Sequence, residues 1–198
     1  MVVAVAAVVV VLGVAAVRQG SPEAQPVAIA GVPAPQAQSA ECRALLDALP
    51  EQLGDYRRAA TVDPTPAGAA AWQADPGGEP VILRCGLDRP ADFTVASPLQ
   101  VVAPVQWFRV GEAGAGDDRV GEAGAGDDRV GEAGAGDDRV GEAGAGDASA
   151  RSTWYVVDRP VYVALTLPAG SGPTPIQKIS EAVAETMPAT RPDPAPIS

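Results

Sequence analysis

The chain has 198 residues, enough for one or two domains, and a formal net charge of −11. An acidic total argues against a nucleic-acid partner, because binding to phosphates needs a basic face. The chain contains no histidine. That excludes Ser-His-Asp and Cys-His catalysis within the chain and removes the commonest metal ligand. We therefore expect no catalytic residues, no metal and no cofactor.

The first segment is an unbroken apolar run from Val2 to Val17, made almost wholly of valine and alanine. As a helix it would be about 24 Å long, slightly short of the roughly 30 Å core of a bilayer. A helix that is apolar all round has no polar face for water, which disfavours a buried core helix in a small domain. We favour a single transmembrane anchor over residues 1–18, with the rest of the chain outside the cytoplasm. The alternative is a cleaved signal segment and a secreted protein.

The next segment, residues 19–40, contains four prolines among Gln, Ala, Gly and Ser. This composition is typical of an extended spacer, so a linker that lifts a domain off a membrane surface is predicted. Residues 188–198 are also rich in proline and are predicted to be a disordered tail.

A helix is predicted to begin after Ser39, whose hydroxyl suits an N-cap, and to end or break at Pro50. Its apolar positions have the spacing i, i+3, i+4, i+7 and are Cys42, Leu45, Leu46 and Leu49.

The chain has two cysteines, Cys42 and Cys85. Two cysteines outside the cytoplasm usually pair, and the ring closed here would contribute roughly 4 kcal/mol on the chain-entropy model. The alternative is a pair of buried free thiols. A redox pair is disfavoured because there is no C-x-x-C spacing, and two cysteines alone cannot form a structural zinc site.

Two strands are predicted in the middle of the chain. The first, Val81 to Cys85, lies between an Asp-Pro-Gly-Gly turn and Gly86. The second, Val101 to Val110, contains Pro104, which places it at a sheet edge or at a bulge.

A ten-residue repeat, Arg-Val-Gly-Glu-Ala-Gly-Ala-Gly-Asp-Asp, begins at Arg109 and occupies residues 109–150 together with its degenerate end. Each copy offers one sizeable apolar side chain, so the repeat cannot bury enough surface to offset ordering. A calcium-binding β-roll is disfavoured, because that roll has a nine-residue period with paired glycines. We expect a disordered insert that carries most of the negative charge.

A hairpin is predicted from Thr153 to Val157 and from Pro160 to Leu167, with Asp158 and Arg159 at the turn. A closing helix is predicted over residues 175–186, capped by Thr174. Its apolar face comprises Ile176, Ile179, Val183 and Met187.

These elements predict an α+β domain over residues 41–187, interrupted by the repeat. The expected fold is a small antiparallel sheet with an N-terminal and a C-terminal helix packed on it, preceded by one transmembrane helix.

Two groups of side chains are candidates for binding. An anion-binding face for a phospholipid or a wall polymer could be built from Arg57, Arg58, Arg84 and Arg89. Stacking on a sugar or a peptide could involve Trp72, Trp107 and Trp154. In both groups we favour the simpler interpretation, namely solvated arginines paired with acidic residues and tryptophans that fill the core.

Several motifs occur in a familiar order: Cys42 with Leu-Leu-Asp-Ala-Leu-Pro, Pro-Val-Ile-Leu-Arg-Cys-Gly at 80–86, Trp107-Phe108, Trp154-Tyr155, and Arg-Pro-Val-Tyr-Val at 159–163. In this order they resemble the actinobacterial family catalogued as domain of unknown function 3515. The resemblance implies a membrane-anchored or exported envelope protein and no known activity. The repeat departs from the family pattern.

We expect a non-catalytic envelope protein that binds or scaffolds another envelope protein or a wall component and contacts the membrane through its N-terminal helix. The alternative is an envelope enzyme that uses Asp, Glu and Arg side chains without histidine. A clustered pair of buried carboxylates in a cleft would favour the enzyme, whereas a shallow aromatic or basic face without such a pair would favour the binding protein.

Overall fold

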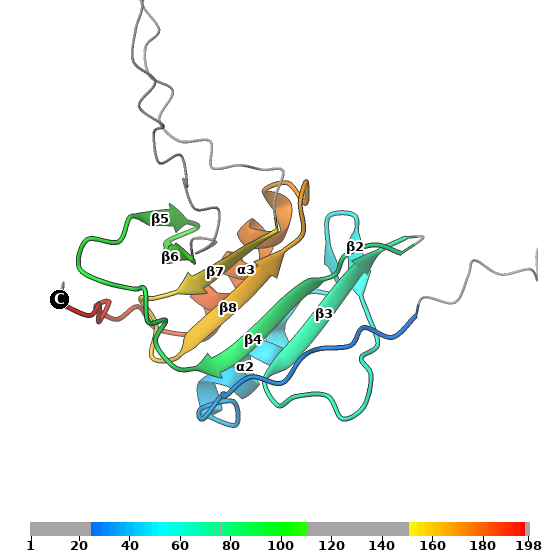
Figure 1. The fold of residues 1–198 in the computed structure, drawn as a ribbon, viewed down its shortest axis with the longest axis horizontal. Helices are drawn as coiled ribbons and strands as arrows, with labels where there is room; N and C mark the ends of the chain where they lie inside the picture. The colour runs from blue at the N-terminus through cyan, green and yellow to red at the C-terminus, as the bar shows by residue number, and fades with distance from the viewer. Residues whose placement is uncertain (1–24, 76, 111–150, 197–198) are drawn as a thin grey trace, which may run out of the picture.

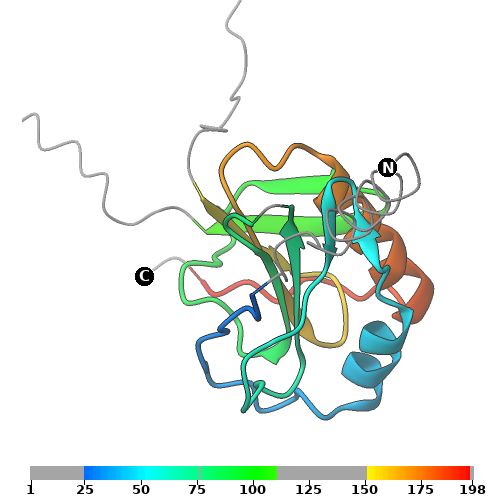
Figure 2. The ribbon, with the colours of Figure 1, turned by 90° about the vertical axis from the view of Figure 1, so that its right-hand side faces the viewer.

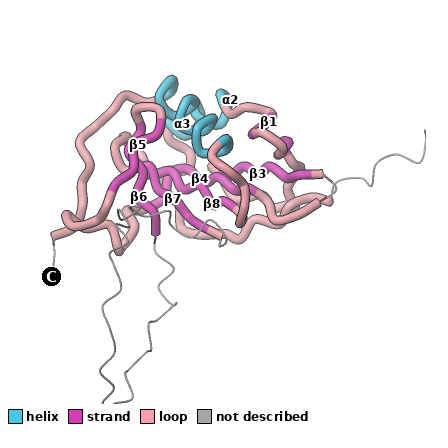
Figure 3. Tube along the Cα trace, turned by 90° about the horizontal axis from the view of Figure 1, so that it is seen from above, coloured by secondary structure: helices cyan, strands magenta, loops and turns pink. Residues whose placement is uncertain are grey.

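The computed structural model describes residues 25–75, 77–110 and 151–196. They form one sheet of eight antiparallel strands and two helices (Figure 1). The elements are α2 (Ala40–Ala48), β1 (Gln52–Leu53), β2 (Tyr56–Arg58), β3 (Ala69–Ala74), β4 (Val81–Leu87), β5 (Leu99–Val102), β6 (Val105–Val110), β7 (Ser152–Val156), β8 (Tyr162–Leu167) and α3 (Thr174–Thr186). The strand order is β1-β2-β3-β4-β8-β7-β6-β5. Both helices lie on the same side of the sheet (Figure 3), which confirms the predicted α+β class with a helix at each end.

Two predicted segments lie wholly or mostly outside the described residues. One is the membrane anchor at residues 1–18. Within the described ranges, no helix has the length and apolar character needed to cross a bilayer. The other segment is the repeat, of which only Arg109 and Val110 are described; both belong to β6 and pair with β7. The repeat therefore joins two neighbouring antiparallel strands.

The N-terminal helix begins where the sequence predicts. The Ser39 Oγ accepts a hydrogen bond from the Cys42 N–H at 3.2 Å, as an N-cap should. The helix ends at Ala48, two residues before Pro50. Its buried face carries Cys42 and Leu45, which pack into the main core between the helices and the sheet.

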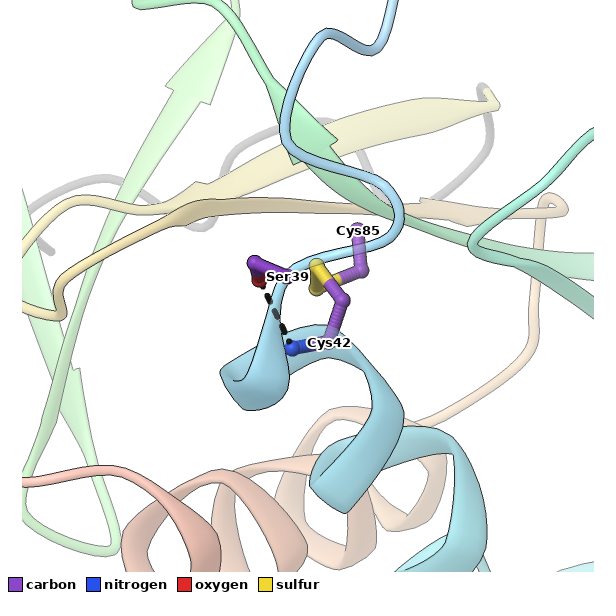
Figure 4. The surroundings of a disulfide bond; sticks show 3 residues. All are labelled: Ser39, Cys42 and Cys85. Carbon is purple, nitrogen blue, oxygen red and sulfur yellow. Dashed lines mark hydrogen bonds between the residues drawn. A yellow bond between two sulfur atoms is a disulfide. The ribbon is translucent and has the colours of Figure 1, made fainter.

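A disulfide joins this helix to the sheet (Figure 4). Cys42 in the first turn of α2 is bonded to Cys85 in β4, with 5.6 Å between the Cα atoms, and both residues are fully buried. The predicted pairing is therefore present, and it connects the first helix to a central strand.

Gly86 allows the chain to approach β4 closely enough for this bridge. It lies at a β-bulge with φ +85°, and its carbonyl accepts a 3.0 Å hydrogen bond from the Gln36 N–H. A Cβ atom added to Gly86 would lie 2.2 Å from the backbone nitrogen of Ala37. Because Ala37 is only five residues from Cys42, a side chain at Gly86 would push the start of α2 away from its disulfide partner.

The main core lies between the helices and the inner side of β4 and its neighbours. Val81, Leu83 and Cys85 alternate toward this core, as side chains on one face of a strand must. Two tryptophans are fully buried in it. The Trp72 Nε1–H donates to the carbonyl of Pro50 at 2.8 Å, and the Trp107 Nε1–H donates to the Ser180 Oγ at 2.9 Å, so each ring buries its apolar body and keeps its polar atom paired.

The C-terminal helix packs the predicted face against this core. Ile176, Ile179 and Val183 of the helix and its C-cap residue Met187 are all buried. The predicted cap is wrong, because Thr174 is already helical and Pro173 occupies the N-cap position without a side-chain hydrogen bond. Proline at the start of a helix loses no intrahelical bond, since the first N–H groups have no partner.

The strand pattern differs from the prediction at two places. The single strand expected at residues 101–110 is a hairpin, β5 and β6, with Ala103 and Pro104 in the turn. Proline has no N–H to donate, so it stops the ladder instead of lying within it. The strands β1, β2 and β3 were not predicted; β3 is rich in alanine (Ala-Ala-Ala-Trp-Gln-Ala) and lacks the β-branched residues that signal a strand.

The side of the sheet opposite the helices is covered by the two ends of the described chain (Figure 2). Val27 and Ile29 are buried against Ala71 and Ile82, and Val27 forms a parallel bridge with Thr61. This part of the expected linker is therefore packed on the domain. Its proline content conceals an alternation of Val27, Ile29 and polar or small neighbours that is typical of a strand.

The expected disordered tail is also packed in part. Ala195 forms a parallel bridge with Thr94 and exchanges backbone hydrogen bonds with Phe93 and Val95 at 2.9 and 3.0 Å. Phe93 is buried beside Phe108 and Val157 in a small separate core. The last described residues thus hold the loop after β4 against the sheet.

Candidate functional site

A groove lies beside the N-terminal segment on the sheet face away from the helices. We call it the Arg84 groove. Its volume is about 420 Å³, its floor comes from Arg84, Thr153, Tyr155, Ala164 and Thr166, and its walls come from Val32, Pro33 and residues 87–90. The N-terminal segment borders the groove through Val32 and Pro33, and the C-terminal end contributes no residue to its lining.

The sheet register explains why the floor is hollow. Arg84 in β4 lies opposite Ala164 in β8, and Ala164 lies opposite Tyr155 in β7. The three side chains therefore form one row across the sheet, with the small alanine between two long residues. Thr166 and Thr153 are paired in the neighbouring row, and their hydroxyl oxygens are 3.2 Å apart.

Arg84 is a half-buried cation with few partners. Its Nη2 donates to the carbonyl of Ala30 at the long distance of 3.4 Å, and its buried Nε has no hydrogen-bond partner. Among the described residues, no carboxylate forms an ion pair with it. Burial lowers the pKa of the Arg84 guanidinium, and the nearby Tyr155 opposes this effect, so the site already disfavours an uncompensated positive charge.

The other polar groups of the groove are mostly donors. The Tyr155 phenol is half-buried, and its burial raises its pKa, with Arg84 acting in the opposite direction; it is therefore neutral and keeps its proton at physiological pH. Arg89 adds a second guanidinium, 3.5 Å from the exposed carboxylate of Asp193. Asp88 is the one carboxylate in the lining, and it is exposed.

The predicted four-arginine face is divided in the structure. Arg84 and Arg89 line the same groove. Arg58 instead lies over the ring of Trp72, with its guanidinium carbon 4.9 Å from the ring centroid, on the side of the sheet that carries the helices. Arg57 is exposed, and it points to the opposite side from Arg58 because side chains alternate along a strand.

The predicted tryptophan group is divided as well. Trp72 and Trp107 are fully buried and cannot stack on a ligand. Trp154 is half-buried and lines a second groove of about 420 Å³ between the β5–β6 hairpin, the loop at 168–173 and the first turn of α3. The guanidinium carbon of Arg109 lies 5.7 Å from its ring centroid. We call this hollow the Trp154 groove.

Sequence reasoning missed four residues that matter in the structure: Thr153, Tyr155 and Thr166 in the Arg84 groove, and Arg159. Arg159 forms a buried ion pair with Asp158 at 2.8 Å, with side chains 3% and 4% exposed. It also donates to the carbonyl of Pro104 at 2.9 Å. The one sequence signal for the three groove residues is alternation. Thr153, Tyr155 and Thr166 lie between core-facing positions of the predicted hairpin, so they share the opposite face of the sheet.

The described residues contain one buried carboxylate and no group of metal-ligating side chains. Asp158 is their one buried carboxylate, and it is paired with Arg159. In the part of the chain that the structure describes, no three Cys, Asp or Glu side chains are grouped as metal ligands would be.

The fold and its grooves define a disulfide-linked α+β protein with a hollow on each side of a single antiparallel sheet. A family model described as "Protein of unknown function (DUF3515)" matches residues 1–123 and 140–192, and the chain belongs to this family. The internal stretch that the family model leaves unmatched, residues 124–139, falls inside the repeat. A search of curated proteins and a search of solved structures found no match.

Proposed function

We propose that this protein is a non-catalytic component of the cell envelope. Its N-terminal apolar segment anchors it in the membrane, and its α+β domain lies outside the cytoplasm, where it binds or scaffolds another envelope component. The observation that carries this proposal is the buried Cys42–Cys85 disulfide between α2 and β4, because such bridges persist in oxidising compartments. The composition of Val2 to Val17 supports the anchor, because a helix that is apolar all round has no polar face for water.

The character of the grooves supports binding in preference to catalysis. The Arg84 groove is lined by two guanidinium groups, two threonine hydroxyls and one phenol, with a single exposed carboxylate. An enzyme working with Asp or Glu would need a second carboxylate, or one with a perturbed environment, beside its substrate. The buried Asp158 lies outside the lining of either groove.

A topology reporter tests the compartment. Alkaline phosphatase fused after Ser198 should be active in cells expressing the full chain, because that enzyme folds only where disulfides form. The matched control is the same fusion without residues 1–24, which should be expressed and inactive. A full-chain fusion that is expressed but inactive would contradict the proposed location.

A further inference from the structure

We propose that the Arg84 groove is a binding site for a phosphoryl group. This assignment rests on the proposed binding function and gives it a ligand class. It is based on three properties of the groove: its uncompensated cation, the hydroxyl donors that surround this cation, and the position of the groove relative to the N-terminal segment.

The first property is the charge of Arg84. A buried or half-buried ion without a counter-ion loses hydration and gains no Coulomb energy in return. Arg84 has one long bond to the Ala30 carbonyl, a buried Nε without a partner and no carboxylate within ion-pair distance among the described residues. An anion in the groove would supply the missing charge, and the planar guanidinium matches the oxygens of phosphate in a two-bond geometry.

The second property is the set of donors beside Arg84. The Thr153 and Thr166 hydroxyls and the Tyr155 phenol come from adjacent strands and face the same hollow. Thr153 and Thr166 bond to each other, but each hydroxyl can take part in further bonds. A phosphoryl group presents more acceptor oxygens than a carboxylate, so it can accept from Arg84 and from several hydroxyls together.

The third property is location. The proposed anchor ends at residue 18, and Val27 is already packed on the domain. Nine residues of fully extended chain span at most roughly 30 Å, so the domain would lie near the membrane surface. Val32 and Pro33 of the same segment form one wall of the groove. Phospholipid headgroups and soluble phosphoesters are both within reach of such a site.

The test uses the full chain in dodecyl maltoside micelles, which contain no phosphoryl group, with two probes. Isothermal titration calorimetry with glycerol 3-phosphate measures the affinity for a soluble phosphoester. The rise in unfolding temperature when phosphatidylglycerol is added to the micelles measures the stabilisation by a lipid phosphate, since a ligand that binds the native state stabilises it.

The Arg84→Gln variant should weaken the Kd for glycerol 3-phosphate by about 10- to 100-fold, as expected for loss of a charged hydrogen-bonding partner, or should abolish the rise with phosphatidylglycerol. The matched control is Arg57→Gln, which removes the same charge from an exposed position on β2 and should change either readout by less than about 2-fold. The double variant Thr153→Val, Thr166→Val replaces both partners of one hydrogen bond by groups of similar shape, so it should fold normally and bind more weakly.

Binding of either probe that depends on Arg84 and on the two threonines supports the assignment, and the probe that binds names the source of the phosphate. No saturable binding of either probe, or equal losses in the Arg84 and Arg57 variants, would overturn it. The two proposals can fail separately. An inactive phosphatase fusion would contradict the envelope location without changing the measured affinity for phosphate. Absence of binding would contradict the ligand class without changing the location.

Discussion

Replacing Cys42 and Cys85 together with alanine should lower the free energy of unfolding by about 4 kcal/mol. The bridge closes a ring across a sequence separation of 43 residues, and the chain-entropy model gives about 4 kcal/mol for a ring of that size. A single domain has roughly 5–15 kcal/mol in total, so the variant should be largely destabilised at growth temperature. The loss should be concentrated at the start of α2, which the bridge ties to β4.

Urea unfolding of the wild type and the double variant measures this loss. The control is the wild-type protein with excess reductant, which breaks the same bond without changing either residue. The double variant and the reduced wild type should both unfold at a lower urea concentration than the oxidised wild type. Equal midpoints for oxidised and reduced protein would show that the bridge contributes nothing to stability.

Replacing Arg159 with methionine should cost about 3–5 kcal/mol. Arg159 and Asp158 are a buried ion pair at the β7–β8 turn, and removing one partner leaves the other as an uncompensated buried charge. The substitution also removes the 2.9 Å hydrogen bond to the Pro104 carbonyl. That bond links the β7–β8 turn to the β5–β6 turn, so we expect the β5–β6 hairpin to loosen first.

The matched control is Arg89→Gln, which breaks the exposed pair with Asp193 and should cost less than about 1 kcal/mol. A second variant, Asp158→Leu with Arg159→Met, removes both charges and should be more stable than Arg159→Met alone. Chemical denaturation of all three variants gives the comparison. If Arg159→Met and Arg89→Gln lost equal stability, the buried pair would not have the role described.

The elements with strong local signals could be predicted from the sequence. Ser39 and the leucine spacing define α2, and the alternation of Val163 and Leu165 with smaller residues defines β8. The cysteine pairing follows from the count of two cysteines together with the expected compartment. In each case one short stretch of sequence contains the physical reason for the structure.

The elements that depend on distant contacts could not be predicted in the same way. The alanine-rich β3 is a strand because it pairs with β2 and β4, and its own residues favour other structures. Val27 is buried because Ala71 and Ile82 leave an apolar surface for it to cover. In both cases tertiary contacts override local composition.

The candidate site shows the same division. Arg84 could be named from the sequence as one of four arginines that might bind an anion. Its relation to Thr153, Tyr155 and Thr166 depends on the pairing of β4, β8 and β7, and β4 and β7 are separated by the whole repeat in sequence. Arg58 and Arg84 lie on opposite faces of the sheet, and this too depends on how the strands pair and on which face the helices cover.

The disulfide state of the protein in living cells tests most directly whether the domain folds and works outside the cytoplasm. Cells are quenched with a thiol-alkylating reagent before lysis, and the protein is digested without reductant for mass spectrometry. We predict one cross-linked species that joins the Cys42 peptide to the Cys85 peptide, with neither cysteine alkylated. Recovery of both cysteines as alkylated thiols would contradict both the oxidising location and the bridge that ties α2 to the sheet.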